Sequence, residues 1–387
     1  MGGATEDDNG MTWFLEQANG GDIVVLRTSG SDGYNDYFYT DLGVNINSVE
    51  TIVCTNNTSG SSSYIVQKIN QAEGIWFAGG DQWTYVNYWR GTPVGDAINS
   101  AINDRKVVIG GTSAGMAIQG SHYFSAENGT VTSGTALVNP FDASVTVDST
   151  RFIENNYMNN VVTDTHFDNP VRNGRLVVFL SRMLEDYGIQ GKAIACDEYT
   201  AVCIDSAGIA RVYGGFPTYD DNAYFVRVNC ELPDVSPEEC SPNTPLTWNL
   251  NAEALAVYRV KGNASGANYL DLNDWQSGNG GTWHRWYVDN GTFIESVGSV
   301  IDCESASLSE FILDIHIGPN PFMESIHVQS ESIIESIEIL NTLGEQVYFE
   351  QTSSKDASIE LRGLASGLYM LRANSDKGTF EQQMVKR

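Results

Sequence analysis

Apolar residues in the first 232 positions fall into short, nearly continuous runs that alternate with longer amphipathic stretches. The runs predict strands buried on both faces, and the stretches between them predict helices. The expected strands are 22–26, 48–53, 74–78, 106–109 and 192–196, and the expected helices include 6–18, 63–71 and 93–103. Strands that alternate with helices indicate an α/β fold, a parallel sheet covered on both faces. In such sheets the site lies beyond the carboxyl ends of the strands.

The pattern changes twice farther along the chain. Residues 229–245 are rich in Pro, Glu and Ser, and residues 246–310 are rich in aromatic and β-forming residues. These aromatic residues either add strands to the first domain or form a small module of their own. From about Phe311 apolar and polar residues alternate with period two, which predicts an antiparallel β-sandwich. We therefore expect three parts, at 1–232, 233–310 and 311–387.

The chain opens with Met1-Gly2-Gly3-Ala4, which is typical of the loop that follows a strand. We expect a first strand and a leader to lie ahead of this loop. No apolar run in the sequence approaches membrane-spanning length.

Charge and composition narrow the possible partners. The 49 acidic and 21 basic residues give a net charge of −28, and a surface of this kind repels nucleic acid and anionic membranes. Only 18% of the residues are charged, which favours an extracellular, loop-rich protein. Of the six cysteines, Cys230 and Cys240 bracket a Pro- and Glu-rich loop and are the best candidates for a disulfide. Histidines and cysteines do not cluster with ligand spacing, so no metal or cofactor is expected.

The segment from Val107 to Ile118 carries the strongest chemical signal. An apolar run leads into Gly111-Thr112-Ser113-Ala114-Gly115 and then into a helix-compatible stretch. This order is typical of a nucleophile elbow, a tight strand-to-helix turn that exposes a serine hydroxyl. Such a turn also directs helical N–H groups toward an oxyanion that forms beside Ser113.

A serine nucleophile needs a base, and His166 is the best candidate among the five histidines. His316 and His327 lie in the C-terminal tail, His122 follows the elbow too closely, and His284 sits in the aromatic segment. The third member of a triad is a carboxylate that orients the imidazole. Glu198, after the strand that ends at Cys196, is the first choice, and Asp197 is the reserve.

Four spaced motifs within residues 1–232 resemble those of cyanophycinases and aspartyl dipeptidases, the S51 serine peptidases. The motifs are Phe77-Ala78-Gly79-Gly80-Asp81-Gln82, Gly111-Thr112-Ser113-Ala114-Gly115, His166-Phe167 with Arg172 and Arg175, and Asp197-Glu198-Tyr199-Thr200-Ala201. The resemblance implies a flavodoxin-like sheet related to class I glutamine amidotransferases. It also implies Ser113, His166 and Glu198 as the catalytic residues.

The same resemblance implies an oxyanion hole and a substrate pocket. The backbone N–H groups of Gly80 and Ala114 would hold the oxyanion, Gln82 would line the pocket, and Arg172 and Arg175 would bind an aspartyl carboxylate. Two features depart from the family pattern: Pro170 stands where cyanophycinases tend to carry another arginine, and the loop between the elbow and His166 is longer, with a polar insert at 127–148. Hydrolysis of aspartyl peptide bonds is therefore expected, with the β-aspartyl-arginine links of cyanophycin as one substrate. S51 relatives are often dimers, so a homodimer is one expected assembly.

Three other functions are consistent with parts of the sequence. An α/β-hydrolase esterase has the elbow but places its histidine last, so it would have to recruit His284. A cell-surface binding protein could keep the fold without activity and use the aromatic residues 246–310. A class I amidotransferase would need a cysteine nucleophile, where this chain has Ser113.

The last 75 or so residues resemble the C-terminal sorting domain of type IX secretion. The features that carry the resemblance are Pro319-Asn320-Pro321-Phe322, the turn Asn341-Thr342-Leu343-Gly344-Glu345, the strand Gly367-Leu368-Tyr369 and the basic C-terminus. They imply export through the outer membrane, with the type IX machinery as a partner and a secreted or cell-surface location.

Overall fold

The computed structural model describes residues 1–303, 315–342, 344–375 and 378–387. The chain divides into two compact units, Met1–Asp302 and Cys303–Arg387. The boundary expected near residues 310–311 lies outside the described residues. None of the helices in the described ranges is long and apolar enough to cross a membrane.

A four-stranded parallel sheet forms the first half of the larger unit. Its order is β2-β1-β3-β4, and every neighbouring pair is parallel. The strands are β1 (Asp22–Arg27), β2 (Ser48–Val53), β3 (Gly74–Phe77) and β4 (Val108–Gly111). The predicted α/β sheet is therefore confirmed, with strand ends that differ from the expected ones by a residue or two.

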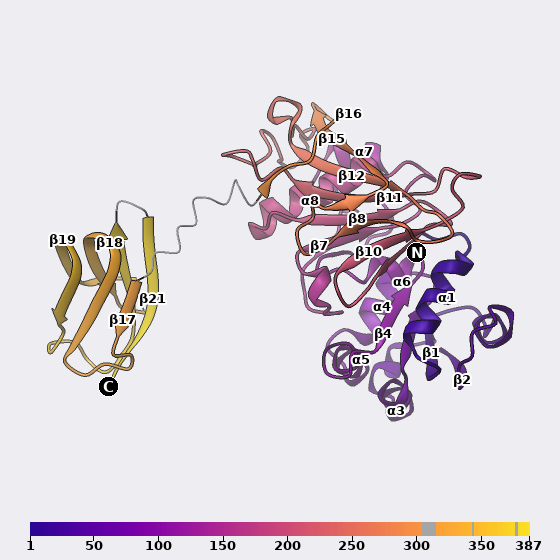
Figure 1. Cartoon of the computed structure of the whole chain (residues 1–387), viewed down its shortest axis with the longest axis horizontal. Helices are drawn as coiled ribbons and strands as arrows, with labels where there is room; N and C mark the ends of the chain where they lie inside the picture. The colour runs from indigo at the N-terminus through magenta and orange to yellow at the C-terminus, as the bar shows by residue number, and fades with distance from the viewer. Residues whose placement is uncertain (304–314, 343, 376–377) are drawn as a thin grey trace. The chain divides into compact units, whose positions relative to one another are not determined.

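Helices cover both faces of this sheet, because side chains of successive strand residues point to opposite faces. On β1, Ile23 and Val25 pack with α1 (Asp8–Gln17), whereas Val24 and Leu26 pack with the helices opposite. Those helices are α3 (Ser63–Gln71), α4 (Gln82–Trp89) and α5 (Pro93–Asn103). Figure 1 shows α1 on one side of the strands and α3 and α5 on the other. Burial of these apolar faces is the main favourable term in folding of the unit.

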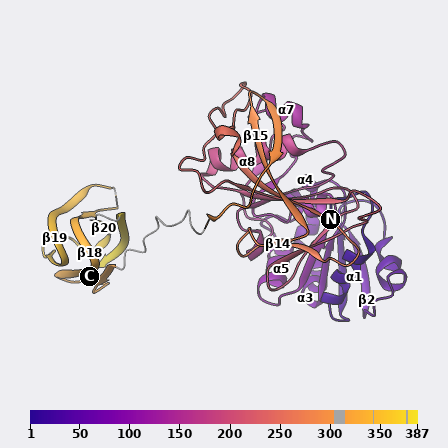
Figure 2. The same ribbon diagram turned by 45° about the horizontal axis from the view of Figure 1, so that its top comes forward.

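A second sheet of six strands has the order β16-β15-β12-β11-β8-β7, in which only β7 and β8 are parallel. Its strands are β7 (Val161–Asp164), β8 (Lys192–Cys196), β11 (Asn222–Val228), β12 (Leu255–Lys261), β15 (Gly281–Asp289) and β16 (Thr292–Val297). Helix α8 (Asn173–Tyr187) packs against it, near β15 in Figure 2. Much of the aromatic segment therefore adds strands to the sheet, because Leu255, Val257 and Trp286 are buried in the core that α8 covers.

Shorter elements complete the unit. A third sheet contains β9 (Ala201–Ile204), β10 (Ile209–Tyr213), β13 (Asn268–Asp271) and β14 (Gly278–Asn279). The remaining elements are α2 (Tyr34–Asp36), α6 (Ala114–Ala117), α7 (Ser133–Val138), β5 (Tyr123–Phe124), β6 (Val147–Asp148), a π-helical turn (Tyr37–Asp41) and 3-10 turns (Asn57–Ser61, Asn156–Met158 and Leu250–Ala252).

The expected disulfide between Cys230 and Cys240 is wrong. Cys230 and Cys303 are disulfide-bonded, and Cys240 is a free thiol. The sulfur of Cys240 lies 3.7 Å from the hydroxyl of Ser181 on α8, and its side chain packs against the core around that helix. Cys54, Cys196 and Cys203 are free and buried.

The C-terminal unit is an antiparallel sheet that curls around its own core (Figure 1). Its strands are β17 (Ile315–Gly318), β18 (Ser325–Leu340), β19 (Gln346–Glu360), β20 (Gly367–Ser375) and β21 (Gly378–Lys386). The two strands expected at 325–328 and 333–340 form the single strand β18, which pairs with β19 through several register shifts. Phe322, Ile326 and Leu371 are fully buried in this sandwich-like core.

Candidate active site

Ser113 lies at the tight turn between β4 and α6 and has φ 52° and ψ −115°. A non-glycine residue with positive φ is uncommon and often marks a functional turn. Gly111 and Gly115 are required here, because a Cβ on Gly111 would collide with the backbone of Gly115, and one on Gly115 with the Phe77 carbonyl. Helix α6 is only four residues long, so its dipole is small.

The structure brings the three predicted triad residues together in the order expected. Ser113 Oγ lies 2.8 Å from His166 Nε2, and His166 Nδ1 lies 2.6 Å from Glu198 Oε1. The hydrogen bond from His166 holds the pKa of Glu198 below its usual value. Asp197, the reserve choice, is buried and accepts hydrogen bonds from Asn222 instead.

His166 and Glu198 follow the carboxyl ends of two neighbouring parallel strands, β7 and β8. Such ends meet at one edge of a sheet, and here hydrogen bonds join the loop that carries His166 to the loop that carries Glu198. Asp168 Oδ1 accepts the Glu198 N–H at 2.9 Å, and the Asn169 amide lies 3.4 Å from Glu198 Oε2. These bonds fix the carboxylate that orients the imidazole.

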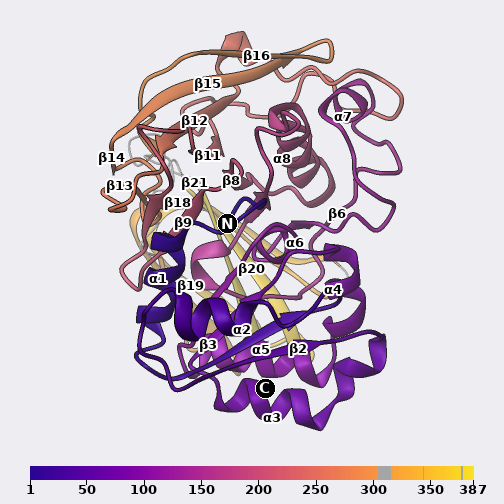
Figure 3. The ribbon, with the colours of Figure 1, turned by 90° about the vertical axis from the view of Figure 1, so that its right-hand side faces the viewer.

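The first three residues hydrogen bond to the backbone of Ser113 and His166 and of Tyr199, the neighbour of Glu198, which the sequence analysis did not anticipate. The carbonyls of Met1, Gly2 and Gly3 accept the N–H groups of Ser113, His166 and Tyr199, at 3.1, 2.7 and 3.1 Å. A Cβ on Gly3 would collide with the His166 imidazole. The Gly2-Gly3 pair was the available signal, because adjacent glycines often allow a close backbone approach. In Figure 3 the N-terminus lies between β8 and α6.

A cavity of about 550 Å³ opens beside Ser113. Its lining includes the predicted residues Gly80, Gln82, Arg172 and Arg175, together with Asp81, Trp83, Phe124, Glu127, Thr130 and His166. The volume lies in the range that suits a small ligand or a short peptide. Among the described residues, neither Gly80 N–H nor Ala114 N–H donates to a backbone carbonyl, so both are free to bind an oxyanion.

The two arginines of the cavity differ in what they contact. Arg175 is only 3% exposed, forms a two-pronged pair with Asp164, and also donates to the carbonyl of Val131 at 3.1 Å. Arg172 donates to the Thr165 carbonyl at 2.9 Å, while no described residue accepts a hydrogen bond from its buried Nε. Burial lowers the pKa of Arg172.

The other two histidines of the larger unit lie elsewhere. His122 is buried, with its ring 5.5 Å from that of Tyr187. His284 contacts Thr282 and Glu295 on β15 and β16. Neither lines the cavity beside Ser113, so the esterase arrangement that recruits His284 finds no support in this geometry.

A serine elbow, a histidine and a carboxylate at the carboxyl ends of parallel strands are the arrangement expected of a hydrolytic site on an α/β fold. Comparison with known proteins then narrows the class. Residues 31–149 match the model of peptidase family S51, and residues 316–387 match that of the secretion system C-terminal sorting domain. One part of the chain is therefore similar to peptidase family S51, and its C-terminal part to a type IX sorting domain, which indicates secretion or a cell-surface location.

The curated relatives to which the chain is similar are named cyanophycinases. A cyanophycinase from Synechococcus elongatus is 25% identical over 225 residues, which are 55% of this chain and 64% of that protein. One from a Nostoc species is 25% identical over 200 residues, 51% of this chain and 59% of that protein. The chain thus spans less than two thirds of these relatives. A solved peptidase from an acI-B1 actinobacterium matches 54% of this chain and 82% of its own, with 16% identity and a TM-score of 0.38.

Proposed function

We propose that this protein is an exported serine peptidase that hydrolyses peptide bonds beside aspartyl residues through an acyl-enzyme on Ser113. The observation that carries the proposal is the chain of contacts from Ser113 Oγ to His166 Nε2 and from His166 Nδ1 to Glu198, at the edge of a cavity. A neutral imidazole that donates Nδ1–H to a carboxylate keeps Nε2 free to accept a proton.

In the first half-reaction His166 Nε2 takes the proton of Ser113 Oγ as the oxygen attacks the peptide carbonyl carbon. The carbonyl oxygen becomes an oxyanion, and the N–H groups of Gly80 and Ala114 stabilise it. His166 then donates its proton to the amide nitrogen, and the C–N bond breaks. In the second half, water loses a proton to His166 and attacks the ester carbon. His166 then returns that proton to Ser113 Oγ as the ester C–O bond breaks and the carboxylic acid product leaves.

Arg172 is the residue we propose to bind the substrate carboxylate. Its Nε is buried without an acceptor, and an unpaired buried donor in a cavity is best satisfied by a ligand. A guanidinium also pairs well with a carboxylate. Arg175 then acts as a positioning residue, since Asp164 already holds its guanidinium. Gln82 completes the lining on the α4 side.

The acidic side chains in the lining of the cavity favour a substrate with a basic side chain. Asp81 and Glu127 line it, and the whole chain carries a net charge of −28. An arginine side chain linked to the substrate aspartate would be attracted by this negative charge. We therefore place a β-aspartyl-arginine polymer such as cyanophycin first among the candidate substrates, with cleavage at the peptide bonds between its aspartyl residues, which leaves each β-aspartyl-arginine link intact.

The deciding experiment is mass spectrometry of products from two substrates, a β-aspartyl-arginine polymer and a set of α-aspartyl peptides. Ser113→Ala is the control, because it removes the nucleophile while the fold around small residues is kept. Release of β-aspartyl-arginine dipeptides by the wild type alone supports the full proposal. Cleavage of α-aspartyl peptides alone supports the proposed triad but assigns a different class of substrate. A folded protein that cuts neither substrate contradicts the proposal.

A further inference from the structure

Asp197 and Asn222 form a buried polar contact directly beside the triad carboxylate. Asp197 follows the last residue of β8, and Asn222 is the first residue of β11, which pairs with β8 in antiparallel fashion. Only 3% of Asp197 and 5% of Asn222 are exposed to solvent. Glu198 is the next residue after Asp197, so the contact that holds Asp197 also holds the start of the loop that carries the triad carboxylate.

The hydrogen bonds of this contact fix the orientation of the Asn222 amide. The Asp197 N–H donates to the Asn222 carbonyl at 2.9 Å, and the Asn222 N–H donates to Asp197 Oδ2 at 3.1 Å. Asn222 Nδ2 donates to Asp197 Oδ2 at 2.8 Å and to the Asp220 carbonyl at 2.6 Å. Both hydrogens of the amide are therefore used. A flipped amide would place Asn222 Oδ1 against two acceptors, so its oxygen and nitrogen cannot exchange places.

Two oxygen atoms in this contact lack a donor. Among the described residues, no group donates a hydrogen bond to Asp197 Oδ1 or to Asn222 Oδ1, although both atoms are buried. Buried polar atoms in native proteins nearly always have a hydrogen-bond partner, so two orphaned acceptors in one contact need a physical explanation. Each orphaned oxygen shares its carbon with an atom that already joins the two side chains. One hydrogen between the two oxygens therefore satisfies both.

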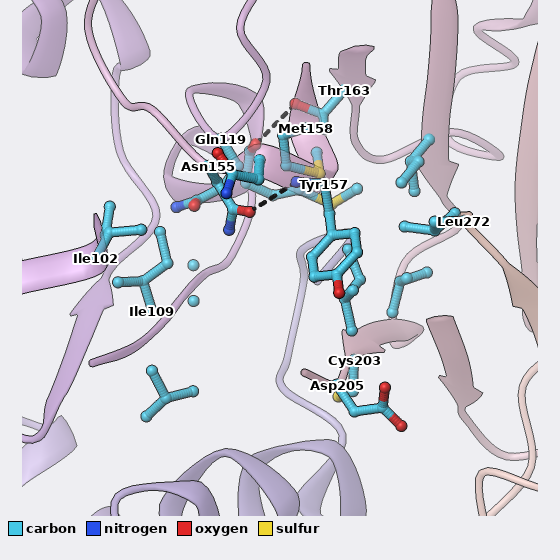
Figure 4. Close-up of a pocket in the computed structure, with 18 of the residues that line it drawn as sticks. Ile102, Ile109, Gln119, Asn155, Tyr157, Met158, Thr163, Cys203, Asp205 and Leu272 are labelled. Carbon is cyan, nitrogen blue, oxygen red and sulfur yellow. Dashed lines mark hydrogen bonds between the residues drawn. The ribbon is translucent and has the colours of Figure 1, made fainter. Parts of the chain in front are cut away.

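The side chains that face Asp197 and titrate are acids. They are Asp168 in the loop after β7, Asp221 ahead of β11, Tyr224 of β11 and Cys196 of β8, with the buried Met1 amino group near Cys196. Burial raises the pKa of Asp197 to about 7, and the charges of Asp168 and Asp221 act in the same direction. Neither Asp197 nor Asn222 lines the catalytic cavity or the larger cavity of about 1020 Å³ that Figure 4 shows, so a ligand in either cavity does not reach the orphaned oxygens.

We propose that Asp197 and Asn222 are positioning residues for Glu198, joined by a proton that Asp197 Oδ1 carries and Asn222 Oδ1 accepts. The acid and the amide then form a ring of two hydrogen bonds, O–H to oxygen on one side and N–H to oxygen on the other. The proton comes from solvent, and only an O–H bond forms. Both orphaned oxygens are satisfied in this state, without a charge in the core. The effect on catalysis rests on the proposed function, whereas the shared proton does not.

The pair acts on Glu198 through the backbone and through neighbouring charges. The Glu198 N–H donates to Asp168 Oδ1 at 2.9 Å, which joins the loop after β8 to the loop after β7. When Asp197 loses the proton, its charge lies near those of Asp168 and Asp221, and the hydrogen bond between the two orphaned oxygens is lost. Repulsion between these carboxylates acts on the same two loops, which carry the histidine and the carboxylate of the triad. The alignment of the triad should therefore weaken as the pH rises above about 7.

The first test is independent of activity. Carbon-13 NMR of the full chain, labelled at the carboxyl carbons of aspartate, follows the protonation of Asp197, whose signal is the one missing from Asp197→Asn. We expect this signal to titrate near pH 7. A midpoint near the ordinary value of about 4 would overturn the proposal. A bound cation is the rival explanation of the orphaned oxygens, so a rise in Tm on adding calcium at about pH 8, seen in the wild type and absent from Asp197→Asn, would overturn it too.

The second test is the pH profile of kcat/KM for an aspartyl substrate. With a midpoint near 7, about one tenth of the molecules keep the proton at about pH 8, so kcat/KM of the wild type should fall about tenfold. Asp197→Asn replaces the O–H by an amide N–H and should remove this decline. Asp197→Leu is neutral but makes neither hydrogen bond, and it should lower kcat/KM by about tenfold or more at every pH. Asp220→Asn is the matched control, because it removes a charge from the same loop at a side chain that is 81% exposed.

Three outcomes of this profile contradict the proposal. One is a decline above pH 7 that persists in Asp197→Asn, and another is a decline that Asp220→Asn removes equally. The third is equal activity of Asp197→Asn and Asp197→Leu, because a neutral side chain without hydrogen bonds would then suffice. A protein that titrates near pH 7 in the first test but cleaves neither substrate contradicts the proposed function alone, so the two failures are distinguishable.

Discussion

At the scale of single residues, the two arginines of the cavity have different surroundings. Arg172 keeps a buried donor free, and Arg175 is held by Asp164 in the core. Arg172 is therefore available to a ligand, whereas Arg175 stabilises the loop that carries His166. Three predictions at this scale follow from local charge and burial.

The first concerns substrate binding. Arg172→Gln should raise KM for an aspartyl substrate by about 10- to 100-fold, because a charge-assisted hydrogen bond contributes on the order of 1.5–3 kcal/mol. The effect on kcat should be much smaller. Arg182→Gln on the same helix is the matched control, since Arg182 pairs with Asp186 away from the cavity. Equal KM values for the two variants would contradict the assignment.

Arg175→Gln should act on stability instead. It leaves Asp164 buried without its strong partner, and breaking a buried pair costs about 3–5 kcal/mol. Chemical denaturation of Arg172→Gln and Arg175→Gln measures this difference. A substantial loss of stability in the Arg172 variant, with none in the Arg175 variant, would reverse our assignment of the two roles.

Asp197 gives a prediction of pH dependence. Burial raises its pKa to about 7, so the native protein holds a proton that the unfolded chain releases from about pH 4 upward. The free energy of unfolding should therefore fall as pH rises from about 4 to 7 and level off above. Asp197→Asn should flatten this part of the profile. Thermal unfolding across this range checks it, with the exposed Asp96→Asn as control; identical slopes in all three proteins would exclude Asp197 as the cause.

At the scale of elements, the site depends on three backbone segments that meet at the carboxyl ends of β4, β7 and β8. The elbow supplies Ser113, the loop after β7 supplies His166, and the loop after β8 supplies Glu198. The segment Met1–Gly3 hydrogen bonds to all three. A change in that segment should therefore alter catalysis without touching a catalytic side chain.

Gly3→Ala tests this arrangement. Gly3 has φ +115°, and a Cβ there would displace the His166 ring. A displacement of about 1 Å can cost on the order of 100-fold in rate, so kcat/KM should fall at least that far. Gly43→Ala is the control, because Gly43 also has positive φ (+67°) but no atom within 4 Å of the added Cβ. An equal loss of kcat/KM in the two variants would show that backbone strain, and not contact with His166, lowers the activity.

At the scale of the whole molecule, the chain consists of two compact units with separate cores. The larger one carries the complete candidate site. The smaller one matches the sorting domain and contains none of the proposed site residues. Catalysis and export are thus expected to be separable.

A chain that ends at Cys303 should keep the Tm and the hydrolytic activity of the larger unit, and should lose export. Ending there retains both disulfide-bonded cysteines, Cys230 and Cys303. Calorimetry of the full chain should show two transitions, of which the shortened chain keeps one. A single transition in the full chain that is lost on shortening would mean that the two units unfold together.

Much of the fold and the candidate site could be predicted because both depend on local patterns. The strand and helix periodicities of residues 22–111 depend on neighbours a few residues apart, and they gave the parallel sheet. Ser113, His166 and Glu198 each follow a strand end, so the alternation of strands and helices also indicated where they would meet. The role of each residue remains a proposal, to be tested with the variants above.

Contacts between distant positions could not be predicted in the same way. The state of Cys240 depends on Ser181 in α8, the burial of Arg175 on Asp164 at the end of β7, and the bracing of the triad on Met1–Gly3. The sequence by itself determined the elements and the order of the site residues, because short-range periodicity and turn chemistry specify them. Only the tertiary structure decided which distant groups pair and which remain free, because packing joins positions whose separation along the chain carries no pattern.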